Sequence, residues 1–207
     1  MTPQLQREVA VPLSSHDRIL RAAKQLFASR GYENTSTVAI ARMAGTSESQ
    51  LMKHFGSKEG LLEAIFDQGW ERMGYLLRGI HDLRSPQEKL QALLEVVLNA
   101  LERDLELKEL MLLEGRRVRK EGKMVMLTRG YLEFVKVVDS VLAEMRASDQ
   151  LRPEVNPEVV RSGLTGLFEG LLRDQILAQR VGYPAKYSNE EIRSFFNIVL
   201  GALGPER

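Results

Sequence analysis

The chain contains no cysteine among its 207 residues. This absence excludes disulfide bridges, thiolate metal ligands and cysteine nucleophiles. Histidine is scarce as well, since only His16, His54 and His81 occur and they lie far apart in the sequence. The motifs G-x-G-x-x-G, H-E-x-x-H and G-x-S-x-G are also missing. We therefore expect no metal site, no cofactor and no enzymatic activity.

Long apolar runs are absent too, because no stretch approaches the roughly 18 residues that a membrane span requires. The first residues, MTPQLQREVAVPLSSHD, lack the charged-then-apolar layout of a signal peptide. The sequence therefore predicts a cytoplasmic protein without a membrane partner. The 29 basic and 28 acidic side chains give a net charge of +1, which excludes a uniformly basic nucleic-acid coat. Any basic surface must be local, and residues 1–60 carry eight basic against five acidic side chains.

Apolar residues recur at a helical period along nearly the whole chain. The first stripe consists of Ile19, Leu20, Ala23, Leu26 and Phe27. Five further stripes follow the same period, in residues 62–80, 90–101, 127–145, 160–176 and 192–203. No alternating, β-branched stretch bounded by turn residues occurs. The sequence predicts an all-α protein of about nine helices with short connections.

Short polar motifs mark the helix starts. Ser47-Glu-Ser-Gln50, Ser85-Pro-Gln-Glu88 and Ser188-Asn-Glu-Glu191 each place a hydroxyl at the N-cap and a carboxyl or amide three residues later. Each of these side chains can satisfy a backbone N–H at the helix start. Asn156 before Pro157 indicates a further start. Helix ends are expected at Gly31, Gly182 and Gly204.

The segment from Thr37 to Phe55 carries the strongest local signal. A first helix is predicted to run to Ala44, the glycine after it to supply a left-handed turn, and Ser47 to cap a second, short helix. Ile40 and Leu51 are placed to pin the two helices together. This pattern is that of a helix-turn-helix. The polar start of its second helix would face the major groove of DNA, where amide and hydroxyl groups can pair with bases and phosphates.

The same region resembles the TetR (tetracycline-repressor) family of bacterial transcriptional regulators. Residues 19–27, Gly31-Tyr32 and Thr35 are similar to that family's first helix and turn. Its second to fourth helices are matched by Ile40-Ala41, Ala44-Gly45, Ser47, Leu51, His54-Phe55, Ser57-Lys58-Glu59 and Leu61-Leu62. The resemblance covers roughly residues 15–66, while the later helices match only in number and length. It implies a sequence-specific, ligand-responsive repressor that binds a pseudo-palindromic double-stranded DNA operator as a homodimer.

By this resemblance, eight side chains stand where family members touch DNA: Thr37, Thr46, Ser47, Ser49, Gln50, Lys53, His54 and Lys58. The last of these, at the start of the fourth helix, would meet a phosphate. Two positions depart from the family pattern, because Glu48 stands where lysine is common and Met52 where tyrosine is usual. Phosphate repels an acidic side chain, although glutamate can accept from the N4 amine of cytosine. These departures leave a second interpretation open, a helical interaction protein that has lost DNA binding.

Three segments are expected: a flexible N-terminal arm of residues 1–14, a helix-turn-helix DNA-binding domain of residues 15–60, and a helical ligand-binding and dimerisation domain of residues 61–207. Glycine costs about 1 kcal/mol inside a helix, so three glycines on one face favour a close helix–helix approach. We expect the last two long helices to form a four-helix dimer bundle, with intramolecular core packing as the alternative. The predicted interface residues are Gly163, Gly166, Leu167, Gly170, Leu171, Phe195, Phe196 and Val199.

A cavity between helices would suit a small apolar or aromatic effector. The candidate lining residues, which fit a solid core equally well, are Trp70, Tyr75, His81, Met111, Tyr131 and Phe134. The densest basic run, from Arg116 to Lys123, is interpreted as a solvated helix connection. Contact with an acidic ligand or with the DNA backbone is the alternative for this run.

Overall fold

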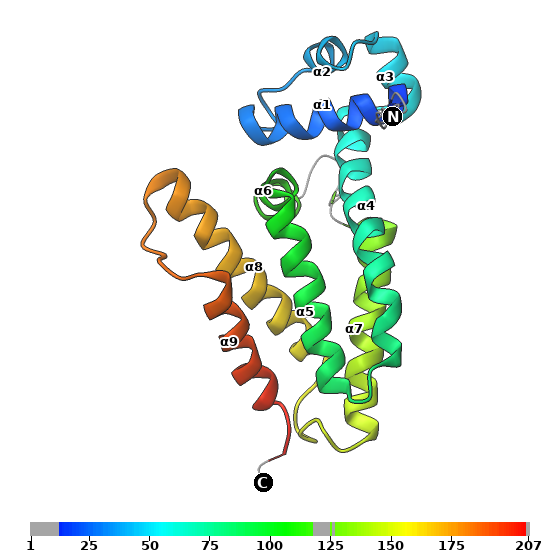
Figure 1. Ribbon diagram of the computed structural model, residues 1–207. Helices are drawn as coiled ribbons and strands as arrows, with labels where there is room; N and C mark the ends of the chain where they lie inside the picture. Colours follow the sequence, from blue (N-terminus) through cyan, green and yellow to red (C-terminus); the bar gives the residue numbers. More distant parts are fainter. Residues whose placement is uncertain (1–12, 118–124, 126, 206–207) are drawn as a thin grey trace, which may run out of the picture. The chain divides into compact units, whose positions relative to one another are not determined.

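The computed structural model describes residues 13–117, 125 and 127–205. Within these residues the chain forms nine α-helices and one short 3₁₀ helix, with no strand (Figure 1). The expected all-α fold is thereby confirmed. No helix in the described ranges is long and apolar enough to cross a membrane. The chain divides into two compact units, one ending at Leu61 and the other beginning at Leu62.

The first unit contains a helix-turn-helix. It comprises α1 (Ser15–Arg30), α2 (Thr37–Met43), α3 (Glu48–Phe55) and the start of α4 (Lys58–Leu77). The apolar stripe predicted for the first helix is buried, and it packs with apolar residues of the following helices. The buried side chains of this core include Ile19, Leu20, Ala23, Leu26, Phe27, Tyr32, Ile40, Ala41, Leu51 and Leu61.

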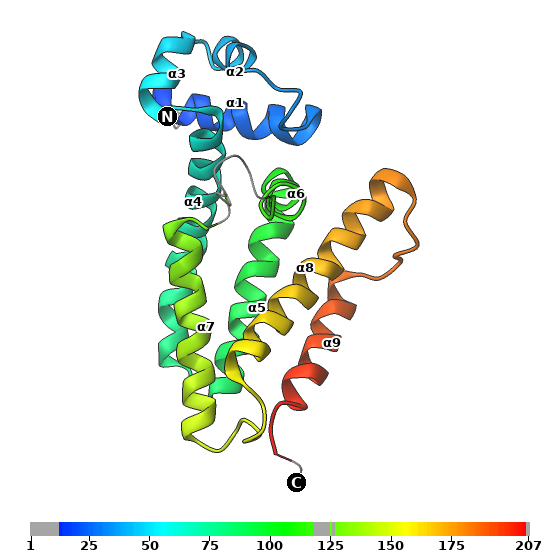
Figure 2. The same ribbon diagram turned by 180° about the vertical axis from the view of Figure 1, so that it is seen from behind.

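The second unit is a helical bundle arranged around α5. It contains the rest of α4, η1 (Arg78–Asp82), α5 (Pro86–Arg103), α6 (Leu105–Leu113), α7 (Arg129–Ala147), α8 (Pro157–Val181) and α9 (Asn189–Gly201). The central helix α5 packs against α6, α7 and α9, and α8 packs against α6 and α7. Figure 2 shows α5 running between α7 on one side and α9 on the other. A core cluster unites η1, α5, α7, α8 and α9 through residues such as Ile80, Leu93, Leu142, Val160 and Leu200.

Capping explains most of the helix starts. Ser85 and Ser188 each form the complete capping box, in which the hydroxyl accepts from the N3 backbone N–H and the N3 carboxylate accepts from the serine N–H. Ser47 also accepts from the backbone N–H of Gln50. The reciprocal bond predicted for this motif is replaced, because the Gln50 amide nitrogen lies 3.2 Å from Nε2 of His54. The caps at Ser85 and Ser188 are therefore confirmed in full, and the cap at Ser47 only in its first half.

Helix ends agree with the prediction at two glycines and differ at the third. Gly31 and Gly182 follow α1 and α8 with φ of +85° and +72°. The last helix, however, ends at Gly201 and not at Gly204. After α9 the chain turns to the loop that follows α7, where Nε of Arg152 donates to the Gly204 carbonyl at 2.8 Å. The Gly204 carbonyl thus bonds to the loop after α7 and takes no part in the helix.

Two predicted features lie partly outside the described residues. Residues 1–12 of the N-terminal arm are outside them, while Ser14 is described and caps α1 by accepting from the backbone N–H of Asp17. Residues 118–123 of the basic run are also outside. Arg116 and Arg117, which are described, each form an ion pair with a glutamate. These two residues are thus held by carboxylates of the protein itself.

α7 approaches α4 closely at Gly130. A Cβ atom on this glycine would lie 2.5 Å from Cβ of Trp70. The backbone N–H of Gly130 donates to the Asp67 carboxylate at 2.9 Å, which fixes the first turn of α7 against α4. The close approach therefore requires a residue without a side chain at position 130.

Replacing Gly130 by alanine is expected to lower the free energy of unfolding by about 1–3 kcal/mol, because Cβ of Trp70 is attached to the α4 backbone and cannot give way. Gly74→Ala is the matched control, since Gly74 lies inside α4 and a Cβ there would meet nothing within 4 Å. That substitution should raise the unfolding free energy by up to about 1 kcal/mol through helix propensity. Urea unfolding followed by circular dichroism measures both. Unchanged stability of the Gly130→Ala variant would show that α7 shifts away without penalty.

Candidate functional site

The helix-turn-helix forms as its local signals predict. α2 is followed by Ala44 and then by Gly45, whose φ is +63°, and Ser47 caps α3. Ile40 and Leu51 are both fully buried. The turn therefore fixes the direction of α3, and the two apolar side chains anchor it to its support.

The start of α3 presents polar side chains to solvent. Glu48, Ser49, Lys53 and His54 are exposed, and Gln50 is half-buried. Ser47 uses its hydroxyl oxygen to accept from the Gln50 backbone N–H at 3.2 Å, so its first role is to cap the helix. An exposed polar helix start of this kind can offer hydroxyl, amide and ammonium groups to base edges and phosphates.

Glu48 is held in place by the preceding helix. The hydroxyl of Thr37, the first residue of α2, donates to the Glu48 carboxylate. The contact joins the first residues of α2 and α3, and it directs an acidic group to the start of α3. The sequence identifies Glu48 as a departure from the family pattern and as a possible acceptor from cytosine, but it does not indicate the bond to Thr37.

His54 connects α3 with α1. Its Nε2 lies 3.2 Å from the Ser15 hydroxyl and 3.2 Å from the amide nitrogen of Gln50. Its ring also meets the His16 ring edge-to-face, with 5.6 Å between the centroids. These contacts order the C-terminal half of α3 and orient the Gln50 amide.

Lys58 binds the loop between α1 and α2. Its ammonium donates to the backbone carbonyls of Tyr32 at 3.0 Å and Thr35 at 3.2 Å, and it lies 4.2 Å from the centroid of the Tyr32 ring. Two of its three ammonium protons are therefore engaged within the protein. A phosphate contact by Lys58 would rely on the third.

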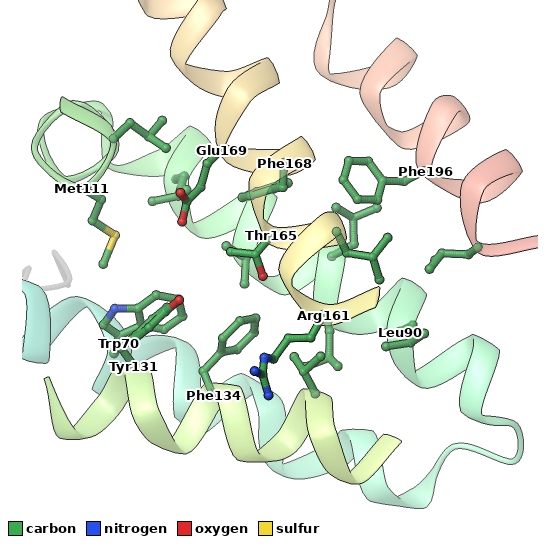
Figure 3. Close-up of a pocket in the computed structure, with 18 residues that line it drawn as sticks. Trp70, Leu90, Met111, Tyr131, Phe134, Arg161, Thr165, Phe168, Glu169 and Phe196 are labelled. Atoms are coloured by element: carbon green, nitrogen blue, oxygen red, sulfur yellow. The ribbon is translucent and has the colours of Figure 1, made fainter. Parts of the chain in front are cut away.

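The second unit contains a cavity of about 110 Å³, which is open on one side (Figure 3). Four of the residues predicted for it line its wall: Trp70, Met111, Tyr131 and Phe134. The remainder of the wall is largely aliphatic and comes from α5, α6, α8 and α9. Sequence patterns missed these positions, which include Leu93, Val97, Leu164, Phe168, Phe196 and Leu200.

Tyr75 and His81 do not belong to the cavity, and their prediction was wrong. Tyr75 is 66% exposed and carries the Arg78 guanidinium on its ring, 4.5 Å from the centroid. Five residues separate Tyr75 from Trp70, which places the two side chains about 140° apart around α4. His81 is exposed in η1. Aromatic character alone did not indicate which side of the helix faces inward.

Two arginine–carboxylate pairs lie at the cavity wall. Nη1 of Arg161 lies 2.6 Å from both oxygens of Asp139, and these hydrogen bonds raise the pKa of Arg161. Arg116 holds both oxygens of Glu169, with Nε at 2.9 Å and Nη2 at 2.7 Å. The bond to Glu169 raises the pKa of Arg116. The two charged residues that line the cavity, Arg161 and Glu169, are thus each paired with a side chain of opposite charge.

The predicted interface residues fall into two groups. Gly163, Gly166 and Phe195 are exposed, and a Cβ on either glycine would meet nothing within 4 Å. Leu167, Gly170, Leu171 and Val199 are half-buried. Phe196 does not fit the prediction, because it is 3% exposed and lies in the cavity wall, 6.1 Å from the Phe168 ring. Ile198, which the prediction omitted, is 70% exposed on α9.

Metal ligation has no support in the described part of the chain. No group of three or more histidine, aspartate or glutamate side chains gathers there in a way that could hold a metal ion. The features that offer binding chemistry are the polar start of α3 in the first unit and the apolar cavity in the second.

Residues 19–65 match the family described as bacterial regulatory proteins, tetR family. The HTH-type transcriptional regulator UidR of Escherichia coli (strain K12) is 26% identical over 189 residues, which cover 89% of this chain and 92% of UidR. The structure of the transcriptional regulator FadR from Bacillus subtilis in complex with stearoyl-CoA matches with a TM-score of 0.78 at 19% identity, covering 90% of this chain and 98% of FadR. AibR in complex with isovaleryl coenzyme A and operator DNA matches with a TM-score of 0.68 at 22% identity, covering 94% of this chain and 100% of AibR.

The two structural similarities show a shared fold. The family match spans the helix-turn-helix, and the similarity to UidR extends over most of both chains. Residues 19–65 therefore form a DNA-binding domain of the TetR family, and over most of its length the chain is similar to a transcriptional regulator.

Proposed function

We propose that the protein is a homodimeric repressor that binds a pseudo-palindromic operator through α3 and releases it when an apolar effector occupies the cavity. In this proposal residues 15–60 bind DNA, and residues 61–207 bind the effector and the second copy. The observation that carries it is the exposed polar start of α3, directed by the Gly45 turn and anchored by the buried Leu51. A helix with this support can enter the major groove without losing its orientation.

The proposed DNA contacts are Thr37, Thr46, Ser47, Ser49, Gln50, Lys53, His54 and Lys58. Gln50 is the strongest candidate for reading a base, because a glutamine amide pairs with an adenine edge and His54 orients it. Ser49 and Lys53 are exposed on the same helix and suit phosphate or base contacts. Two α3 helices in a symmetric dimer would enter the groove about 34 Å apart, one turn of DNA.

The exposed face of α8 and α9 is the proposed dimer interface. The glycines of α8 leave open space beside the helix backbone, and Phe195 and Ile198 of α9 expose apolar side chains. Close approach of a second α8 would fill that space, and the apolar side chains would add buried area. Leu167, Gly170, Leu171 and Val199 border this face, whereas Phe196 is assigned to the cavity.

The cavity is the proposed effector site. An engineered cavity of about 150 Å³ is large enough for benzene, so about 110 Å³ suits a slightly smaller apolar group. The FadR and AibR structures contain acyl-CoA ligands, stearoyl-CoA and isovaleryl coenzyme A respectively. The volume agrees better with a short, branched or cyclic group than with a long chain. An effector that acts on α4 from here must favour the form that does not bind DNA by several kcal/mol to switch it nearly completely.

Selection from a random duplex DNA pool, followed by binding across a salt series, tests the DNA-binding role. We expect an inverted repeat and a steep fall in affinity with salt, because each phosphate contact releases counterions. Gln50→Ala should weaken binding to the selected operator by about tenfold and relax the preference at one base pair in each half-site. Failure to enrich any sequence with a folded protein would contradict the proposal and favour an interaction protein without DNA binding.

Replacing Glu48 by glutamine tests whether the Glu48 carboxylate recognises a base or only repels the DNA phosphates. If Glu48 accepts from a cytosine amine, Glu48→Gln should lower affinity for the selected operator by about tenfold and raise affinity for unrelated DNA, because a negative charge is lost near phosphate. Glu48→Asp is the matched variant, since it keeps the carboxylate charge but withdraws the group by one methylene. It should lower discrimination without raising affinity for unrelated DNA. An equal gain of Glu48→Gln on all sequences would assign Glu48 to repulsion alone. Titrations with fluorescent duplexes measure each affinity.

A charge on the α9 face tests the dimer. Ile198→Glu should convert a dimer into monomer at about 10 μM protein, because an unpaired carboxylate would be buried in the interface. Leu76→Glu is the control, since Leu76 is 58% exposed on α4 and lies outside the proposed face. Sedimentation velocity distinguishes the two states, with circular dichroism to verify folding. Dimers of equal stability in both variants would place the interface elsewhere.

A further inference from the structure

The cavity wall contains no charge that a ligand must neutralise. Arg161 and Glu169 are the charged residues that line it, and each is held by a partner of opposite charge. A carboxylate that entered would lose its hydration and find no cation without a partner at the wall. The wall is therefore suited to an uncharged group.

The indole N–H of Trp70 stands out in this apolar surrounding. Trp70 is 6% exposed, and within the described residues its nitrogen has no hydrogen-bond acceptor. In Figure 3 this nitrogen lies on the edge of the ring that is turned toward Met111, and both side chains line the cavity. A buried donor without an acceptor is unfavourable. A ligand oxygen that moves the flexible Met111 side chain aside and accepts from this nitrogen would remove the penalty.

The hydroxyl of Tyr131, next to Trp70, already has a hydrogen-bond partner. The Tyr131 ring lies 5.3 Å from the Trp70 ring between centroids, and its hydroxyl oxygen accepts from Nη2 of Arg116 at 3.5 Å. Thr165 adds a second hydroxyl to the wall, on α8. Of these groups, only the Trp70 indole is a donor that cannot also accept, so it selects for an acceptor on the ligand.

We propose that the cavity binds an uncharged, largely apolar group that carries one hydrogen-bond acceptor, such as a carbonyl oxygen, and that the indole N–H of Trp70 donates to it. Trp70 is then the specificity-determining residue of the effector site. This inference rests on the proposed role of the cavity as that site. A cavity of this kind does not bind free carboxylates, and its Trp70 donor adds nothing to the binding of pure hydrocarbons.

Three probes of similar size separate these chemistries: cyclopentanone, methylenecyclopentane and cyclopentanecarboxylate at pH 7. Trp70 is the chain's one tryptophan, so ¹⁵N-labelled protein gives a single indole N–H resonance. Cyclopentanone should move this resonance downfield, as expected for a new hydrogen bond. Methylenecyclopentane should bind without that downfield movement. The carboxylate should bind at least tenfold more weakly than the ketone.

Trp70→Phe removes the donor and keeps an aromatic ring. It should weaken cyclopentanone binding by about tenfold and change methylenecyclopentane binding by less than about twofold, as measured by ligand-observed NMR. Tyr75→Phe is the control, because Tyr75 is 66% exposed on the same helix, lies outside the cavity and should leave cyclopentanone binding within about twofold. The indole resonance of the unmodified protein tests the same bond if Trp70→Phe does not fold.

The outcomes distinguish this inference from the proposed function. Equal losses for ketone and hydrocarbon in Trp70→Phe, or tighter binding of the carboxylate, would overturn the role of Trp70 and leave the cavity as a ligand site. No binding of any probe would overturn both the inference and the proposed effector site. A downfield indole shift with the ketone, together with a selective loss in Trp70→Phe, supports both.

Discussion

The contact of α7 with α4 at Gly130 sets the position of the aromatic wall of the cavity. The missing side chain lets the two helices approach, and the bond from the Gly130 N–H to Asp67 fixes the first turn of α7. The next residue, Tyr131, then meets the Trp70 ring at 5.3 Å, and Phe134 meets it at 4.9 Å about one turn later. An aromatic wall with a buried indole donor therefore follows from one glycine and one carboxylate. A larger residue at 130 would move this wall as well as the helix.

α8 combines two surfaces with different requirements. Its inner face contributes Arg161 and Glu169 to the cavity wall, where partners on neighbouring segments hold the helix in position. On α6, which packs against α8, the ammonium of Lys108 donates to Gln175 of α8 at 3.0 Å. Burial lowers the pKa of this lysine. Polar pairs thus secure α8 from within, since a buried charge without a partner would be strongly destabilising. The opposite face is then left without side chains at Gly163 and Gly166, so a second helix can approach the backbone.

Structural features that depend on contacts within a few residues are predictable from the sequence, and features that depend on distant contacts are not. Caps and left-handed glycines act within a few residues, so the cap at Ser47 and the turn at Gly45 were predictable. The side of α4 that faces the cavity was not predictable, because polar residues interrupt its apolar stripe and several orientations of the helix fit the sequence. This is why Tyr75 was wrongly predicted to line the cavity. Phe196 shows the same limit on α9, where apolar residues occur on both faces. The bonds of Lys58 to two loop carbonyls depend on a chain fold that no local pattern encodes.

One helix carries both an anchor of the DNA-binding unit and a wall of the cavity. α4 begins at Lys58, which is bonded to the loop before α2, and continues through Trp70 without interruption. Under the proposed function, a ligand bonded to Trp70 would contact a helix whose first residues belong to the helix-turn-helix unit. Such a ligand changes operator affinity only if it binds the two forms of the protein differently. Thermodynamic linkage then requires that the operator weaken ligand binding by the same factor by which the ligand weakens operator binding. One hydrogen bond at Trp70 can therefore determine which effector binds, but by itself it is too weak to convert the whole population to the form that does not bind DNA.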